Sequence, residues 1–415
     1  MYNWAGKKLL VLGATRFIAE IVLAAKKYGA YVIAVDYNED APAKRIADES
    51  VLLNCMDVDA IVKYIKKNNI DGVMTGFTDS LMMPYFEICK KSGLPCYLTK
   101  ELIDLTTDKE TFKQLCNKFD IPTISEYKTN ENIKFPVIIK PVDNSGARGI
   151  YVCKSYDDYK KYIDIAKSFS KSGKIIIEPY LDFQEATAFY VFNQGMPYFA
   201  ALADRHMMNV RDGILRLPTG YTFPSKGTNL FIKNTDEKFK KLFDFIGIKD
   251  GMMFVQGFLD GNNNFIPYEC GYRLTGSLEY SLMERVCGYN PMCMMINFAL
   301  TGNMGEKKDF DLINPHFKYK SYNLTVLIRP GKISKIIGAD KIASLPNVVN
   351  CYISYEQGDG LKEECWGRLS QAGARILFVA DTDKEYKDTI DFIKENLIIV
   401  DENGNDMMLN KEIIK

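Results

Sequence analysis

Residues 135–150 read FPVIIKPVDNSGARGI, and this stretch decides how the rest of the chain is interpreted. An apolar run ends in Lys140, a proline restricts the backbone after it, and a polar loop containing two glycines follows. A lysine at the end of a strand, next to a loop that presents backbone N–H groups, is suited to hold phosphate oxygens. Taken alone, an ordinary β-hairpin explains the segment equally well.

Polar residues interrupt the apolar segments further along the chain. Residues 174–181 read KIIIEPYL, and Glu185 follows shortly after. Two later strand-like segments place Gln256 and Glu269 between hydrophobic neighbours. A carboxylate buried in this way needs a cation or a hydrogen-bond partner. An ion pair between Glu269 and Arg273 would meet that need without any ligand.

Taken in order, these pieces resemble the ATP-grasp superfamily over about residues 101–302. The shared order is a helix with a lysine, a strand ending in lysine, a glycine loop, an E-x-Y-L hinge, a second glutamate and a pair of metal-binding strands. The resemblance implies ATP and Mg²⁺ as cofactors. It also implies a catalytic core preceded by a Rossmann-like domain and followed by a smaller C-terminal segment.

The resemblance also assigns the nucleotide-binding residues. They are Lys109, Lys140, Ser145, Gly146, Arg148, Gly149, Glu178, Pro179, Tyr180, Leu181 and Glu185. By this resemblance, Lys109 and Lys140 contact the phosphates and Glu185 holds the ribose. The carbonyl of Pro179 and the N–H of Leu181 hold the adenine, which suits a proline because only its carbonyl is required.

The metal and catalytic residues follow from the same resemblance. Gln256 and Glu269 would ligate Mg²⁺ through oxygen, as a hard cation requires. Arg273 and Lys140 are the expected catalytic residues, which neutralise charge during phosphoryl transfer. The sequence departs from the family at one position: the usual E-x-N-x-R has Gly271 in place of asparagine, so either a second metal ion is held differently or the activity is altered. Glutamine at the first metal position also occurs in carbamoyl-phosphate synthetases.

The chain alternates strands and helices over its first part. Residues 8–12 and 31–36 are predicted strands, and a glycine turn at Gly13 and a helix separate them, which indicates a parallel sheet. Asp36 stands where a dinucleotide-binding acid would lie, but only one of the three fingerprint glycines is present. Nicotinamide binding is therefore the weaker interpretation.

The expected fold class is α/β and α+β, in three domains. Residues 1–98 are predicted to form the Rossmann-like domain, residues 99–313 the ATP-grasp domain and residues 314–415 a small C-terminal α+β domain. Within the first domain, residues 95–98 are expected to form a strand. Thr78, Asp79 and Ser80 follow the strand ending at residue 75, where an open sheet commonly meets its ligand, although each could equally cap a helix.

Composition excludes several classes of function. The 53 Lys and Arg residues balance the 53 Asp and Glu residues, so no net field attracts nucleic acid or a membrane surface. Two histidines argue against a histidine triad or a multi-histidine zinc site. Ten cysteines without a C-x-x-C spacing indicate reduced thiols, and with neither a signal sequence nor a long apolar span they favour a cytoplasmic protein.

The leading hypothesis is an ADP-forming carboxylate–amine ligase that makes an acyl phosphate from a small carboxylate, such as an amino acid, and couples it to an amine. Residues 273–279, RLTGSLE, resemble the corresponding segment of the L-amino-acid ligases. The alternatives are a bicarbonate-using carboxylase like those of purine synthesis, and a nucleotide-binding module without turnover. Small-molecule substrates are the expected partners, and homodimers are common in the family.

Two further features are ambiguous. His206 lies in a segment that would face either the nucleotide or solvent. A methionine stripe over residues 283–295 could line a ligand pocket, but at helical spacing it is more often part of a core.

Overall fold

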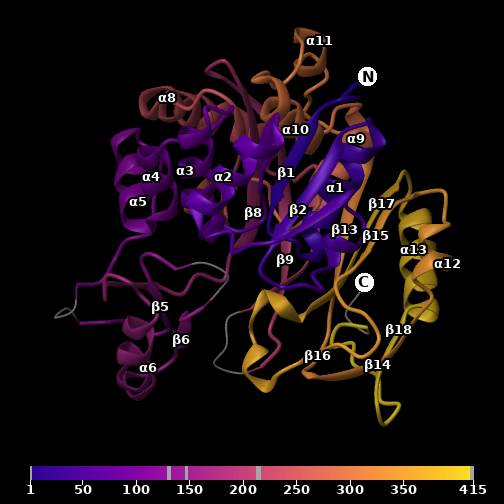
Figure 1. Ribbon diagram of the computed structural model, residues 1–415. Coiled ribbons are helices and arrows are strands. Elements are labelled where there is room, and N and C mark those ends of the chain that lie inside the picture. The colour runs from indigo at the N-terminus through magenta and orange to yellow at the C-terminus, as the bar shows by residue number, and fades with distance from the viewer. Residues whose placement is uncertain (1, 129–131, 145–147, 212–215, 412–415) are drawn as a thin grey trace.

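The computed structural model describes residues 2–128, 132–144, 148–211 and 216–411. The chain begins with a parallel four-stranded sheet in the order β3-β2-β1-β4 (Figure 1). Its strands are β1 (Lys8–Leu12), β2 (Tyr31–Asp36), β3 (Glu49–Leu52) and β4 (Gly72–Met74). Its helices are α1 (Arg16–Lys27), α2 (Val58–Asn68) and α3 (Met82–Ser92). This is the Rossmann-like sheet that the sequence predicts.

The glycine turn after β1 is built differently from a dinucleotide site. Gly13 has a φ of +81°, a conformation that glycine adopts without strain. The side chain of Asp36 accepts a hydrogen bond from the N–H of Ala14 at 2.9 Å, so it fixes the turn. Arg16 extends from the start of α1 to Glu356, 2.9 Å away. An acid already bound to the turn is a poor ribose ligand, which weakens the nicotinamide interpretation.

Two helices, α4 (Lys100–Thr107) and α5 (Lys109–Lys118), follow the first sheet. The strand expected at residues 95–98 is absent. Pro95 cannot donate to a strand ladder, and the carbonyl of Tyr97 instead accepts the hydroxyl of Tyr272 at 3.3 Å. The prediction failed because an apolar run of four residues does not show whether a neighbouring strand is there to pair with it.

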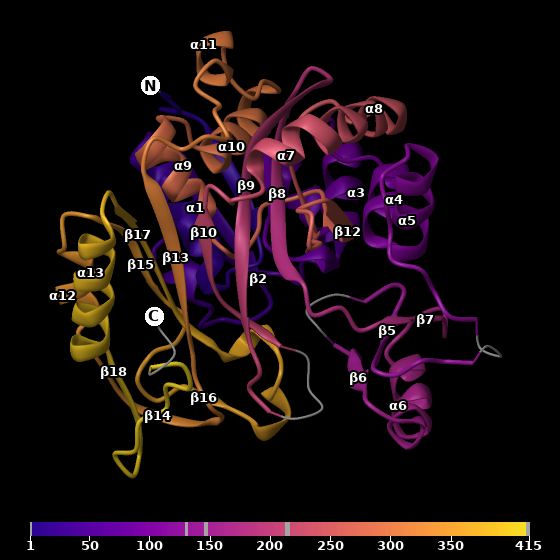
Figure 2. The same cartoon turned by 180° about the vertical axis from the view of Figure 1, so that it is seen from behind.

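A small antiparallel sheet in the order β6-β5-β7 forms the next layer, with one helix packed on it. Its elements are β5 (Val137–Pro141), β6 (Tyr151–Cys153), α6 (Tyr156–Ser168) and β7 (Ile175–Pro179). In Figure 2 it lies below α4 and α5, to the side of the large sheet.

The central feature is an eight-stranded antiparallel sheet in the order β12-β11-β8-β9-β10-β13-β17-β15. Five of its strands come from the middle of the chain: β8 (Gln184–Asn193), β9 (Met196–Met208), β10 (Leu217–Phe223), β11 (Gly251–Leu259) and β12 (Phe265–Gly271). The other three come from the C-terminal part: β13 (Lys320–Leu327), β15 (Val348–Ile353) and β17 (Ala372–Ala380). The C-terminal segment therefore continues the sheet of the central one.

Helices from the middle of the chain cover this sheet. They are α7 (Thr228–Phe231), α8 (Glu237–Ile246), α9 (Glu279–Cys287), α10 (Pro291–Thr301) and α11 (Lys307–Phe310). Gly72 of β4 packs against the backbone of α10, where a Cβ would lie 2.2 Å from the carbonyl oxygen of Ala299. The methionines of α10 are buried in this contact, so the methionine stripe belongs to the core.

The remaining elements form a second layer at the C-terminus, coloured yellow in Figure 1. A small sheet in the order β16-β14-β18 packs with two helices around its own apolar core. These elements are β14 (Gly331–Ile337), α12 (Ala339–Ala343), β16 (Gly360–Leu361), α13 (Asp383–Asn396) and β18 (Ile398–Asp401). Among the described residues, no helix is long and apolar enough to cross a membrane.

Candidate functional site

One buried carboxylate joins two lysines at the small sheet. Lys140 Nζ lies 2.6 Å from Glu178 Oε2, and Lys113 Nζ lies 2.7 Å from Glu178 Oε1. Glu178 and Lys140 are 2% and 6% exposed, so water contributes little to their solvation. Burial by itself raises the pKa of Glu178, but the charges of Lys140 and Lys113 outweigh it and hold that pKa below its usual value. The two lysines thus share one buried anion.

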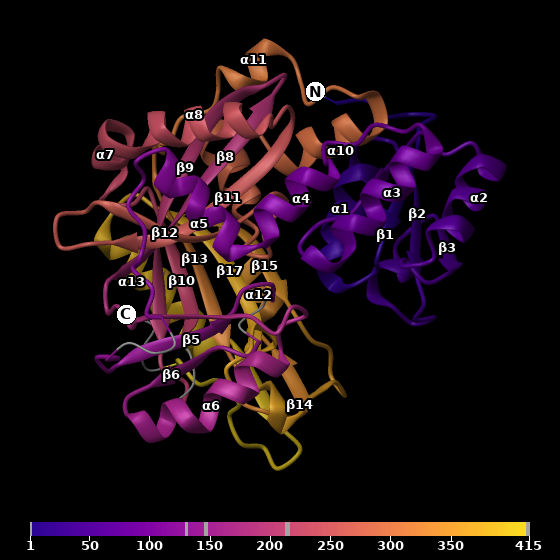
Figure 3. The ribbon, with the colours of Figure 1, turned by 90° about the vertical axis from the view of Figure 1, so that its left-hand side faces the viewer.

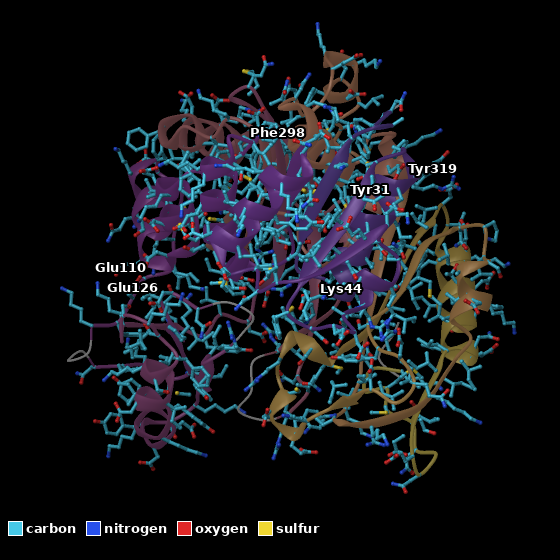
Figure 4. All side chains as sticks on the ribbon, in the orientation of Figure 1. Tyr31, Lys44, Glu110, Glu126, Phe298 and Tyr319 are labelled. Carbon is cyan, nitrogen blue, oxygen red and sulfur yellow. The ribbon has the colours of Figure 1, made fainter. Side chains whose placement is uncertain are left out.

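Lys113 is a site residue that sequence reasoning missed. It lies one turn after Lys109 on the same face of α5, and that spacing was the available signal. Its Nζ also lies 2.7 Å from Glu126 Oε1. Figure 4 labels Glu126 beside Glu110, where α5 meets the small sheet. Lys113 therefore links α5 to β7, the strand that carries Glu178.

The hinge segment turns its backbone in the direction that adenine binding requires. The N–H of Tyr180 donates to the carbonyl of Pro136 at 3.0 Å, so this N–H points toward the strand that contains β5. Alternate residues of a ladder bond to opposite sides, so the carbonyl of Pro179 faces away from β5. The carbonyl of Ile177, two residues earlier, points to the same outer side, where it accepts the N–H of Tyr127 at 2.8 Å. The Pro179 carbonyl is thus directed toward the outer edge of β7.

The glycine loop is described only at its ends. Ser145 and Gly146 lie outside the described residues, while Arg148 is exposed and Gly149 is buried. Gly149 has a φ of +77°, and a Cβ there would lie 2.6 Å from Cβ of Phe169. On the other side, Asn144 Nδ2 donates to the carbonyl of Phe169 at 3.0 Å. Both ends are therefore attached to the turn that follows α6.

Lys109 connects this loop to β12, the strand that carries Glu269. Asp108 caps α5 by accepting the N–H of Thr111, which fixes Lys109 as the first helical residue. Lys109 Nζ donates to the carbonyl of Asn144 at 2.7 Å and lies 3.5 Å from Glu269 Oε2. The pairing of Glu269 with Arg273 that the sequence left open does not occur, because Glu269 faces Lys109.

The two expected magnesium ligands are direct partners. Gln256 of β11 pairs with Glu269 of β12, and a bulge in β12 inserts Tyr268 beside them. Such a bulge turns two successive side chains toward one partner residue. Accordingly, the hydroxyl of Tyr268 lies 3.4 Å from Gln256 Oε1.

These ligands fit magnesium. The described residues contain no group of three His, Cys, Asp or Glu that could hold a metal. A single carboxylate and an amide oxygen suit Mg²⁺, which is commonly bound by few protein ligands together with substrate phosphates. Gln256 and Glu269 would hold that ion.

Glu185, the expected ribose ligand, is bound by two residues that sequence reasoning missed. Arg205 Nη1 lies 2.7 Å from Glu185 Oε2, and the hydroxyl of Tyr268 donates to the same oxygen at 3.0 Å. Arg205 is paired with Glu185 in register across β8 and β9. Neither partner could be found from sequence spacing, because both depend on strand pairing.

The departure at Gly271 has a structural explanation. Phe254 is the cross-strand partner of Gly271, and a Cβ at position 271 would lie 2.4 Å from Cε1 and Cζ of the Phe254 ring. The guanidinium of Arg273 lies 5.2 Å from the centre of that ring. An aromatic ring therefore fills the place of the usual asparagine side chain, and it also supports Arg273.

Arg273 is held from the N-terminal sheet. Its Nε lies 2.5 Å from Asp79 Oδ1, and its Nη2 donates to Asp79 Oδ2 at 2.9 Å. Thr78 makes no side-chain capping bond to the short helix that begins at Asp79, so capping does not explain this segment. Asp79 reaches the site as its position after β4 predicts. His206, by contrast, lies on β9 with its Nε2 2.7 Å from Thr222 Oγ1.

A small pocket lies where these parts meet. It is lined by Lys109, Phe112, Lys113, Lys140, Ile176, Glu178, Pro267 and Tyr268. Three lysines from α5 and β5 line a single pocket, next to the pair of oxygen ligands on β11 and β12. This arrangement matches the chemistry of a magnesium–polyphosphate group.

Residues 133–279 match the family described as the ATP-grasp domain. Over this segment the chain is similar to ATP-grasp domains. A formate-dependent phosphoribosylglycinamide formyltransferase of Histophilus somni (strain 129Pt) is 27% identical over 212 residues, which are 48% of this chain and 54% of that protein. The same enzyme of Prochlorococcus marinus (strain NATL2A) is 31% identical over 189 residues, 43% and 48% of the two chains. The chain thus aligns with only about half the length of the curated relatives it matches.

Solved structures extend the likeness over the whole fold. An L-amino acid ligase from Bacillus licheniformis has a TM-score of 0.76 at 18% identity, covering 96% of this chain and 100% of that one. A phosphoribosylglycinamide synthetase from Anaerococcus prevotii has a TM-score of 0.73 at 22% identity, with 95% and 100% covered. A biotin carboxylase domain from Hydrogenobacter thermophilus, solved with MgADP and bicarbonate, has a TM-score of 0.74 at 16% identity, with 98% and 92% covered. At these identities the likeness concerns the fold.

Proposed function

We propose that this protein is a magnesium-dependent, ADP-forming ligase that phosphorylates a small carboxylate and couples the acyl phosphate to an amine. The observation that carries the proposal is that Lys109 and Lys140 line one pocket, while Glu269, the cross-strand partner of Gln256, lies 3.5 Å from Lys109. The named relatives, which include a ligase and a synthetase of the same fold, support it.

The phosphate end of the site works by charge and alignment. A carboxylate oxygen attacks the γ-phosphorus, the bond from that phosphorus to its bridging oxygen breaks, and ADP leaves. Lys140 and Lys109 would hold the phosphate oxygens, and Arg273 would neutralise the charge that develops on the transferred group. Bound Mg²⁺ supplies further charge neutralisation between Gln256 and Glu269. No nucleophilic side chain is required.

The second half-reaction forms a C–N bond. The amine lone pair attacks the acyl carbon, phosphate leaves with the electrons of the C–O bond, and the nitrogen loses a proton. Arg273 would contact the acyl group from one side, since Asp79 and the ring of Phe254 fix its guanidinium.

The test is ADP release with Mg²⁺ and hydroxylamine over a panel of amino acids, other small carboxylates and bicarbonate. Hydroxylamine traps an acyl phosphate as a hydroxamate, so the natural amine need not be known. We expect a hydroxamate with at least one carboxylate in wild type, and its loss in Lys140→Ala but not in Lys174→Ala, an exposed lysine of the same sheet region.

The other outcomes distinguish the alternatives. ADP release that depends on bicarbonate alone would identify the carboxylating ATPase. Tight MgATP binding with no ADP over the whole panel would identify a nucleotide-binding module, and the proposed ligase activity would then be wrong.

A further inference from the structure

A second cavity lies between α1, α9 and α10, away from the nucleotide site. Its volume is about 170 Å³, and among the described residues none lines both this cavity and the nucleotide pocket. Figures 1 and 3, which view the molecule from different sides, both show α1 next to α10. An engineered apolar cavity of about 150 Å³ binds benzene, so the space suits a small organic molecule. Its walls include Glu20 and Ala24 of α1, Tyr280 and Ser281 of α9, and Met292 and Cys293 of α10.

One wall of the cavity carries a buried hydroxyl group without a partner. Tyr280 is 1% exposed, and its hydroxyl has no hydrogen-bond partner of normal geometry in the part of the chain that the structure describes. Burial and, after it, the negative charge of Glu20 raise the pKa of Tyr280, so the phenol is neutral at pH 7. A neutral phenol both donates and accepts hydrogen bonds. A polar ligand would recover the free energy that this unsatisfied hydroxyl costs.

Glu20 brings a carboxylate to the same cavity without a cation beside it. Burial raises the pKa of Glu20, and the amide of Asn350, whose Nδ2 donates to Glu20 Oε2 at 3.2 Å, offsets only part of that effect. No ion pair involves Glu20 within the described ranges. The three basic residues of α1 pair with other carboxylates, namely Arg16 with Glu356, Lys26 with Asp48 and Lys27 with Glu284. A largely buried carboxylate of this kind is stabilised by a cationic ligand.

The other walls decide the charge and the shape of that ligand. Lys27 and Glu284 line the cavity with 65% and 42% of their side chains exposed, and their charges offset each other at 3.9 Å. Burial raises the pKa of Cys293 to about 12, so its thiol carries no charge at pH 7. Glu20 therefore leaves one unbalanced negative charge, and Met292 adds apolar surface. A molecule with one positive charge and a short apolar body fits, whereas an anion would be repelled.

A primary ammonium group matches the polar atoms of this cavity. It has three N–H donors and no acceptor. The carboxylate of Glu20 and the hydroxyl of Tyr280 can each accept one of these donors, and Ser281, the next residue of α9, carries a further hydroxyl. A metal ion is a poorer candidate, because the described residues contain no group of three His, Cys, Asp or Glu that could hold one.

We propose that the cavity between α1, α9 and α10 binds a small aliphatic primary amine in its ammonium form. Glu20 and Tyr280 hold the ammonium group, and the alkyl chain packs on Ala24 and Met292. The site is separate from the nucleotide pocket, and the proposal does not depend on the ligase activity. Because Glu20 is also bound to Asn350 of β15, the ligand joins α1 to α9 and to the C-terminal strands of the large sheet.

The experiment measures binding to the full chain at pH 7 by calorimetry, with MgADP present so that the nucleotide pocket is filled. Pentylamine is the probe, and pentanol and pentanoate have the same chain with a neutral or an anionic end. Pentylamine should bind and raise the melting temperature. Pentanol should bind at least about 10-fold more weakly, since a charge-assisted hydrogen bond is lost, and pentanoate should not bind in the cavity.

Ala24→Leu locates the binding. The larger side chain fills the cavity without changing its charge, so it should abolish pentylamine binding while leaving MgADP affinity unchanged. Only binding that Ala24→Leu removes is assigned to the cavity, which excludes any probe bound at the carboxylate or amine site of the ligase. Pentylamine binding that survives Ala24→Leu would overturn the proposal, as would cavity binding of pentanoate as tight as that of pentylamine.

Two further variants test the residues that hold the ammonium group. Tyr280→Phe removes a hydroxyl without a partner, so the free protein should lose no stability while the Kd rises about 5- to 10-fold. Glu20→Gln keeps the shape of the side chain and should raise the Kd about 10- to 100-fold. Glu87→Gln, which changes an exposed carboxylate of α3, is the control and should leave the Kd unchanged. An unchanged Kd in both Tyr280→Phe and Glu20→Gln would overturn the proposal.

A second copy of the chain could cover the cavity instead. Leu23 lines the cavity and is 55% exposed. Sedimentation of wild type and Leu23→Ser, with and without pentylamine, tests this outcome. A dimer that Leu23→Ser dissociates, and that pentylamine neither binds nor disrupts, would overturn the proposal. A monomer that binds pentylamine, or a dimer that still binds it, would support the amine site.

Discussion

Two buried glutamates of this protein, Glu178 and Glu279, have different neighbours and opposite pKa shifts. Glu178 is paired with two lysines within 2.7 Å, and its pKa is lowered. Glu279 is bound by two hydroxyl groups, its Oε1 has no hydrogen-bond partner among the described residues, and its pKa is raised. Both are almost fully buried, so the difference arises from their neighbours rather than from exposure.

The two regions differ in whether the buried negative charge is balanced by lysine or arginine side chains of the chain. Around Glu178, lysines of α5 and β5 balance the charge of the carboxylate within the chain. Around Glu279, the charge of Arg375 lowers the pKa of the carboxyl but does not overcome the effect of burial. A buried carboxylate without a balancing cation destabilises the fold. We therefore expect loss of the charge to lower the stability of the protein at Glu178 and to raise it at Glu279.

The largest effect should come from Lys140→Ala at the nucleotide end. We expect turnover to fall about 10²–10³-fold, since a preorganised positive charge beside the phosphates is lost. ADP release with hydroxylamine measures it, and Lys174→Ala should stay near wild type because that lysine is exposed and lies 3.8 Å from the carboxylate of Glu110. Near-normal turnover in Lys140→Ala would contradict the assignment of the phosphate site.

Glu178→Gln should destabilise the protein by about 2–3 kcal/mol, because the buried Lys140 and the partly buried Lys113 lose their shared anion. The carboxylate with a lowered pKa contributes stability above the ordinary glutamate pKa, and that contribution is lost as pH falls through the lowered value. The difference from wild type should therefore be full at pH 7 and shrink below about pH 4.3. Chemical denaturation at several pH values measures it.

Glu110→Gln is the control for this change, since it removes an exposed carboxylate from the same helix (Figure 4). A Glu178→Gln variant as stable as Glu110→Gln would mean that the lysines do not depend on Glu178.

Gly271→Asn tests the close contact between Gly271 and its cross-strand partner Phe254. The new side chain would collide with the ring of Phe254, and overpacking of this kind costs about 1–3 kcal/mol. Phe254→Ala in the same chain should relieve part of that cost, which a double-mutant cycle would measure. Gly261→Asn is the matched control, because nothing lies within 4 Å of a Cβ at that position. Equal stability of the two asparagine variants would refute the role of Phe254.

The smallest expected effect has the opposite sign. Glu279→Gln should stabilise the ligand-free protein by about 1 kcal/mol at pH 7, since an uncompensated buried charge becomes a neutral amide. The pKa of Glu279 is raised, so the penalty of its charge disappears as pH falls through that raised value. The gain over wild type should vanish in acid. Thermal melting over pH 4–8 measures it, and destabilisation at pH 7 would show that Glu279 is already balanced.

Several site residues could be predicted because they belong to local patterns. Lys140 precedes a proline and a glycine loop, Glu178 stands in an E-x-Y-L hinge, and Asp79 follows a parallel strand. Each of these signals lies within a few residues of chain. The parallel N-terminal sheet was predictable for the same reason, since buried strands and helices alternate there.

Other site residues depend on contacts between distant segments. Arg205 meets Glu185 through pairing of β8 with β9, and Tyr268 joins them because a bulge in β12 turns it inward. Phe254 fills the place of a missing asparagine only because it is the cross-strand partner of Gly271. Spacing along the chain contains no record of register, so sequence reasoning missed all three roles.

The sequence by itself determined the order of the catalytic elements, the ATP-grasp resemblance and the residue types suited to phosphate and magnesium. Only the tertiary structure decided which charges balance one another. Glu178 and Glu279 are both glutamates between apolar neighbours, yet one faces two lysines and the other two hydroxyls. The physical reason is that a buried carboxylate takes its properties from groups within a few ångströms, and those groups come from strands and helices far apart in the chain.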